Sequence, residues 1–268
     1  MKAARIIVAL YSLWILLSHP RLPSVAGWPA VFWKAVPHTL LLRFAYFRLN
    51  EALEWILFAA LLLVLVAVLF GLALRYSAFA AGLLLYHVAP LDALLSSGDL
   101  VGLGGLTVPT FFFFALWAAD FRDRWPLMLA QFLLGASFFF SGVTKLTYVG
   151  WRWYTPSNIA QTALTSWSLS GRPAALWIAS HASACWAIAI GSALLDAFFV
   201  VAFASRPIRW VVVPLAVVAT VVRSLAFGVH WLAAPLLLLF IVDLRQCAES
   251  PASSTANSAR PTSLTQGG

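Results

Sequence analysis

The chain has 268 residues, of which 62% are hydrophobic and only 10% are charged. A soluble domain carries roughly 25% charged residues because water must cover its surface, so this composition excludes a soluble globular protein. The net charge of +8 could suggest nucleic acid, but the densest basic stretch is only the triplet Arg122-Asp123-Arg124, and phosphate binding needs Lys and Arg clusters on a water-exposed face. We therefore expect the lipid bilayer as a partner and no nucleic acid.

Long apolar runs bounded by charges or prolines follow one another along the chain, as membrane-spanning helices do. They predict an all-α, polytopic integral membrane bundle of about eight transmembrane helices. The predicted spans cover 6–18, 52–74, 77–95, 106–121, 126–146, 175–205, 209–225 and 228–242. The run 175–205 is long for one crossing, so we expect it to begin as an interfacial segment. The first run could belong to a signal peptide, but no small-residue cleavage site closes it, which favours a retained helix.

Basic residues are unequally distributed between the short loops on the two sides of this predicted bundle. With the N-terminus in the cytoplasm, the interior loops hold Lys2, Arg5, Arg75, Arg122, Arg124, Arg206, Arg209 and Arg245. The short exterior segments hold only Arg152, Arg172 and Arg223. This asymmetry indicates that both termini are cytoplasmic, although counting the four bases of the long segment 19–50 removes it. We expect a multi-pass protein of a bacterial plasma membrane.

The composition changes near the C-terminus. Residues 1–245 are predicted to form one membrane domain, because the apolar runs continue to its end. Residues 246–268 contain mostly Ser, Thr, Ala, Pro and Gly, and such a segment cannot bury enough apolar surface to offset its ordering entropy. We expect this part to be a disordered cytoplasmic tail.

Lys145 is the first of the ionisable residues that the sequence places at membrane depth. Such residues are costly in a bilayer and are functional candidates by default. A lysine in dry surroundings can act as a base through its neutral amine, and Ser141, one helical turn earlier, could hydrogen-bond to it. The alternative is a lysine at a helix end whose amine reaches out to the membrane interface.

Asp196 and His87 are the next candidates. Asp196 lies in an apolar run without a charged neighbour, so it must face the bundle interior, find a cation or be protonated. A structural pair with Arg223 explains it as well as a catalytic role does. A single membrane histidine such as His87 is more often a hydrogen-bonded packing residue than a ligand. No two histidines have the i, i+3 or i, i+4 spacing of a helical metal site, so we expect no metal.

An aromatic phrase follows Lys145, and its members Trp151, Trp153 and Tyr154 taken singly are typical of an interfacial aromatic belt. The whole stretch Phe139-Phe-Ser-Gly-Val-Thr-Lys-Leu-Thr-Tyr-Val-Gly-Trp-Arg-Trp153 resembles the signature of the HTTM superfamily, which includes vitamin K-dependent gamma-carboxylase. In that pattern an aromatic-rich helix ends in Ala/Ser-Gly-x-x-Lys-Leu, and a Trp follows after a short spacer. The stretches 94–99 and 194–200 resemble further family landmarks, and the resemblance covers roughly residues 5–245.

The resemblance implies a chemistry for these residues. Lys145 falls on the lysine that is the catalytic base of the carboxylase, where it deprotonates a reduced quinone of the vitamin K (naphthoquinone) type on the lumenal side. It therefore implies a quinone-dependent carboxylase or epoxidase-like lyase, with Asp196 and His87 as orienting groups. Trp151, Trp153 and Tyr154 would then contribute to substrate binding. An exported peptide or protein is the implied acceptor, since some bacterial relatives are associated with maturation of secreted peptide toxins.

Two readings without this chemistry stay open. The chain could be a non-enzymatic membrane scaffold or export partner, in which Lys145 is only a helix-end anchor. A small-solute transporter would instead show internal symmetry with paired broken helices, and the sequence shows no repeat of that kind.

Overall fold

The computed structural model describes residues 1–20, 22–27, 49–95, 105–119, 123–149, 155–171, 173–203, 205–227 and 233–248. Every regular element in these ranges is a helix, and they contain no strand. The predicted all-α class is therefore confirmed. Within the described ranges, three helices are long and apolar enough to cross a membrane, and they cover Glu51–Phe70, Trp125–Thr147 and Ala182–Phe203.

The helices fall into two groups along the chain. The first group consists of α1 (Lys2–Ser18), the 3-10 helix η1 (Leu22–Gly27), α4 (Glu51–Phe70), α5 (Leu74–Leu95) and α6 (Thr107–Ala118). The second consists of α7 (Trp125–Thr144), the π-helix η2 (Lys145–Val149), α8 (Pro156–Ser170), α9 (Pro173–Ser180), α10 (Ala182–Phe198), the 3-10 helix η4 (Phe199–Phe203), α11 (Arg206–Phe227) and α12 (Ala233–Ala248).

Apart from shifts of a few residues at helix ends, the helices differ from the predicted elements in three ways. The predicted run 175–205 is divided at His181, so that α9 is a separate short helix before the membrane-length helix α10. Helix α8 was not among the predicted spans, because its Asn, Gln, Ser and Thr residues remove the apolar signal on which span prediction depends. Helix α12 continues to Ala248, past the predicted domain end at residue 245, and residues 249–268 lie outside the described part of the chain.

Helix α4 has clear start and stop signals. The Asn50 side chain accepts hydrogen bonds from the backbone nitrogens of Ala52 (2.6 Å) and Leu53 (3.4 Å), which satisfies donors that have no partner within the helix. The helix ends at Gly71, whose φ of +78° is a left-handed conformation that favours glycine. A Cβ at Gly71 would lie 2.8 Å from Nη1 of Arg5. The start of α1 therefore places a positive charge at the negative end of the α4 dipole.

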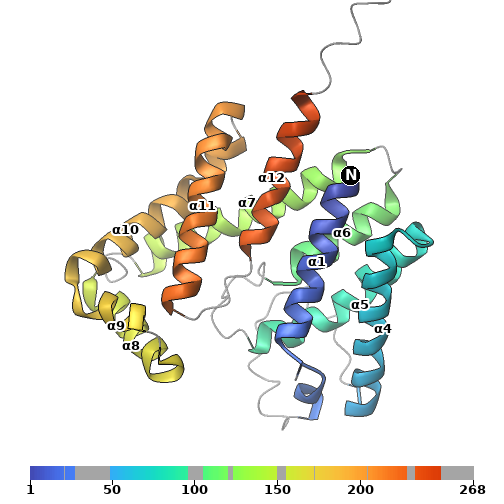
Figure 1. Ribbon diagram of the computed structural model, residues 1–268, viewed down its shortest axis with the longest axis horizontal. Coiled ribbons are helices and arrows are strands. Elements are labelled where there is room, and N and C mark those ends of the chain that lie inside the picture. The colour runs from blue at the N-terminus through green and yellow to red at the C-terminus, as the bar shows by residue number, and fades with distance from the viewer. Residues whose placement is uncertain are drawn as a thin grey trace, which may run out of the picture.

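The packing holds each group together and also joins the two groups, since α6 contacts α7 and α1 contacts α12. Helix α1 contacts α4, α6 and α12, and α5 lies between α4 and α6. In the second group α10 packs against α7, α8 and α9. Figure 1 shows α4 and α5 at the right of the molecule and α8, α9 and α10 at the left, with α7 running across between them. The main buried apolar cluster includes side chains from α1, α4, α5, α6, α7, α11 and α12, and a smaller one joins α8, α9 and α10.

Side chains from α7 hold the C-terminal helices in place. Phe138 of α7 stacks on Phe199 of η4 with 4.6 Å between ring centroids, and Phe199 meets Phe240 of α12 edge to face. Gln131 of α7 donates a hydrogen bond from Nε2 to the Leu239 carbonyl oxygen at 3.1 Å. This bond satisfies a buried amide that would otherwise be costly in an apolar environment.

Helices α7 and α10 approach each other at glycine. A Cβ at Gly142 would lie 2.7 Å from the Cα of Ala197 and 2.8 Å from the backbone carbon of Asp196. Because both of these are backbone atoms, no side-chain movement could make room for it. At Gly135 a Cβ would lie 2.7 Å from Cζ of Phe203, the far end of a side chain that can move. The contact at Gly142 therefore sets the distance between the two helices.

We expect Gly142→Ala to lower the free energy of unfolding by about 1–3 kcal/mol, because the added methyl group separates α7 from α10. Gly135→Ala should cost less, since the Phe203 ring can turn aside. Gly191→Ala should be neutral or stabilising by up to about 1 kcal/mol, because a Cβ there meets nothing within 4 Å and alanine favours the helix. Thermal unfolding of the three variants in one detergent provides the measurement, and equal effects at the three glycines would contradict it.

Candidate functional site

A buried ion pair joins α7 to α10. The Nζ atom of Lys145 donates a hydrogen bond to Oδ2 of Asp196, and the two side chains form a salt bridge. As the sequence analysis required, Asp196 faces the interior and has found a cation. That cation is Lys145. The side chain of Arg223, the other partner considered for Asp196, lies outside the described part of the structure.

The residues before Lys145 assemble this pair. Gly142 lets the α7 backbone reach α10 at Asp196, and Lys145 is three residues further on the same helical face. Ser141 donates a hydrogen bond from Oγ to the same Oδ2 atom of Asp196 at 3.4 Å. Ser141 was predicted to hydrogen-bond to Lys145, but the structure shows its bond to the carboxylate that binds the lysine. The sequence Ser-Gly-x-x-Lys is thus a physical unit whose three named residues meet one aspartate.

The two partners differ in accessibility. The Asp196 side chain is 0% exposed, whereas the Lys145 side chain is 11% exposed. The amine points to the carboxylate, so it does not reach out to the membrane interface as a helix-end anchor would. Only Lys145 can therefore meet a molecule from outside the bundle, while Asp196 can act on it only through the lysine.

The helix changes its pitch at Lys145. Helix α7 ends at Thr144, and Lys145–Val149 continues it as a π-helix. Short π-helical segments are rare and occur frequently at functional sites.

His87 lies in a different pair. Its Nε2 atom is 3.1 Å from both carboxylate oxygens of Glu54, so α5 is bound to the first turn of α4. Glu54 is only 1% exposed. Figure 1 shows α4 and α10 on opposite sides of the molecule. The structure therefore does not bring His87 together with Lys145 and Asp196, and an orienting role for His87 at that pair has no support in the geometry.

Glu54 is a buried, paired carboxylate that was not among the candidates predicted from the sequence. It lies one turn inside an apolar run of membrane length, where a carboxylate needs a partner. That signal was present in the sequence, but a glutamate in the first turn of a helix is also ordinary because it complements the helix dipole.

The predicted substrate-binding residues Trp151, Trp153 and Tyr154 lie outside the described residues. In the sequence they lie between η2, which ends at Val149, and α8, which begins at Pro156. Among the described residues there is also no group of three or more His, Cys, Asp or Glu side chains that could hold a metal ion.

The pair gives a prediction for a double-mutant cycle. We expect Lys145→Met or Asp196→Leu alone to cost about 3–5 kcal/mol of stability, because each leaves one buried charge without its partner. The combination Lys145→Met with Asp196→Leu should recover much of that loss, since both charges are gone. Unfolding of the four proteins in the same lipid–detergent mixture gives the coupling energy. Additive losses would show that the two side chains do not depend on each other.

No family model matches the chain, and no curated protein and no solved structure is significantly similar to it.

Proposed function

We propose that the chain is a polytopic membrane protein with the eight predicted crossings and with both termini in the cytoplasm of a bacterium. The three apolar helices of membrane length support the membrane location. The placement of both termini on one side is supported by groups at the predicted interior ends of different helices, which lie close together. Burial and then repulsion from Arg124 lower the pKa of the Met1 amino group, and Arg5 lies against Gly71. In Figure 1, α1 begins and α12 ends at the same upper side of the molecule.

We propose further that Lys145 is a general base acting on a lipid-soluble substrate, and that the substrate is a reduced quinone of the naphthoquinone type. The observation that carries this proposal is the buried Lys145–Asp196 pair, in which the lysine alone stays partly accessible. The resemblance of the surrounding sequence to the HTTM signature supplies the substrate class. An exported peptide or protein is the proposed acceptor of the chemistry.

In this proposal each residue of the site has a separate task. In the ion pair Lys145 is an ammonium group, so its partly exposed amine must first release one proton to solvent. The neutral amine then takes the proton from a hydroxyl group of the reduced quinone. The carboxylate of Asp196 holds the amine in position and stabilises the ammonium group that forms, because charge-assisted hydrogen bonds are strong where water is excluded. Ser141 fixes the same carboxylate oxygen from the α7 side. Asp196 is therefore a positioning residue, and Lys145 is the only one of the three that touches substrate.

The second candidate is a non-enzymatic scaffold or export partner. It is favoured by one observation, namely that the same pair joins the backbones of α7 and α10 at their closest approach. A lysine and an aspartate whose only role is to join two helices would have this geometry as well. The two candidates differ in what happens when the charge of Lys145 is kept but its basicity is removed.

The test compares oxygen-dependent oxidation of a reduced naphthoquinone by the wild-type protein, Lys145→Ala and Lys145→Arg in lipid nanodiscs. We expect turnover to fall by about 10²–10⁴-fold in both variants, the usual contribution of a positioned general base. Lys145→Arg is the informative variant, because a guanidinium can keep the pair with Asp196 but cannot lose its proton.

Thermal unfolding of the same samples separates chemistry from folding. Stable Lys145→Arg protein without turnover would support the base, whereas wild-type turnover in that variant would disprove it. If the wild-type protein has no activity, or if a co-purifying partner remains bound to Lys145→Arg but is lost from Lys145→Ala, the scaffold candidate is favoured instead.

A further inference from the structure

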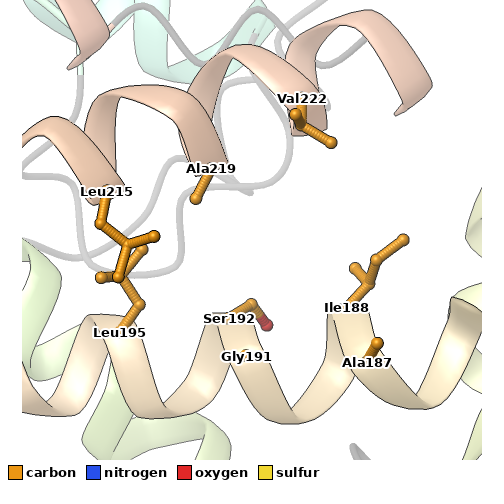
Figure 2. A pocket seen from close by; sticks show the side chains of 8 residues that line it. All are labelled: Ala187, Ile188, Gly191, Ser192, Leu195, Leu215, Ala219 and Val222. Carbon is orange, nitrogen blue, oxygen red and sulfur yellow. The ribbon is translucent and has the colours of Figure 1, made fainter.

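A cavity lies between α10 and α11. It has a volume of about 230 Å³ and is lined by Ala187, Ile188, Gly191, Ser192, Leu195, Leu215, Ala219 and Val222. Figure 2 shows that the side chains of Ala219 and Val222 point from α11 toward Ser192 and Ile188 of α10. Leu195 and Leu215 meet at one end of the cavity.

The lining offers a ligand only hydrocarbon. Seven of its eight residues are apolar or glycine, and the eighth is Ser192. The Ser192 hydroxyl donates its hydrogen bond to the Ala189 carbonyl oxygen of its own helix at 3.0 Å. A water molecule needs two to four polar partners, so the site is too apolar to hold ordered water. The same argument excludes a polar or charged group of a ligand.

The surface around the cavity is apolar and exposed. Ile190 and Leu194 of α10 and Val218 of α11 are 39%, 48% and 58% exposed, and none of them lines the cavity. Helix α10 is one of the three helices of membrane length. In a bilayer this surface faces lipid chains, and a groove in it that stayed empty would lose dispersion contacts along its whole lining.

We propose that this cavity is a binding site for one acyl chain of a bilayer phospholipid. The chain enters between Ile188 and Val222, lies along Gly191 and Ala219 and ends at Leu195 and Leu215. It replaces the side-chain packing that α10 and α11 lack along this length. The site does not depend on the chemistry proposed for Lys145, because neither Lys145 nor Asp196 lines the cavity.

Gly191 makes the proposal testable. It lines the cavity, and a Cβ added to it meets no atom within 4 Å. A leucine at this position can therefore fill the cavity without displacing backbone. Gly191→Ala is the matched control for the change in helix propensity. Ser183→Leu adds a side chain of the same size at an exposed position of the same helix, outside the cavity.

The experiment uses the full chain in nanodiscs that contain a phospholipid with a photoreactive diazirine in its acyl chain. After irradiation, peptide mass spectrometry measures labelling of 187–195 and 215–222 relative to the lipid-facing surface of α4, where Leu63 is 72% exposed. We expect labelling of the cavity peptides to exceed that of α4 in the wild-type protein, in Gly191→Ala and in Ser183→Leu. In Gly191→Leu it should fall to the α4 level while thermal stability is retained.

Three results would overturn the proposal. Wild-type labelling no higher than that of α4 would show that no chain is held at the cavity. Unchanged labelling in stably folded Gly191→Leu would place the bound chain elsewhere. Displacement of the labelled chain by a prenylated naphthoquinone, but not by an unprenylated one, would assign the cavity to the tail of a substrate instead of a phospholipid.

Discussion

The close approach of α7 and α10 at Gly142 is the constraint on which the site depends. Without a Cβ at this position, the α7 backbone lies directly against Asp196 and Ala197. The side chain of Lys145, three residues later, is then close enough to bond to the Asp196 carboxylate. Ser141, one residue earlier, donates a hydrogen bond to the same oxygen. Small residues at helix contacts have this effect in membrane proteins generally, because lipid provides no hydrophobic force that drives helices together. Dispersion contacts and buried polar bonds must hold the helices instead.

Three polar contacts between the described helices help to hold them together. Glu54 and His87 join α4 to α5, Gln131 joins α7 to α12, and Lys145 and Asp196 join α7 to α10. Each joins helices that also share buried apolar contacts, so the polar groups fix the register of surfaces that would otherwise slide. Two of these three contacts involve ionised or ionisable pairs. A buried charge is costly in lipid, and each pair is stable only when both partners are present.

The sequence predicted the helical class, and an interior location and a cation partner were among the options that it gave for Asp196, because these follow from hydropathy and from the cost of a bare charge in lipid. Of the eight predicted spans, three correspond to described helices that are long and apolar enough to cross a membrane. The sequence also singled out Lys145 and Ser141 as neighbours on one helix face. It could not identify the partner of Lys145, because that partner is on a helix distant in sequence and a single chain contains no signal for such a pair. Helix α8 was missed because its sequence is too polar for a span, and the role of Glu54 was hidden by its ordinary position in a first turn.

The π-helix η2 has a consequence for how the site can respond to its surroundings. Each residue of a π-helix turns the chain through a smaller angle than a residue of an α-helix does, because its hydrogen bonds span five residues instead of four. Conversion of η2 to α-helix would therefore rotate Val149 relative to Lys145 about the helix axis. Gly142 and Lys145 would stay in place, since both are fixed to α10 before the rotation begins. The fold thus separates a fixed ion pair from the rest of η2, whose pitch can change without moving that pair.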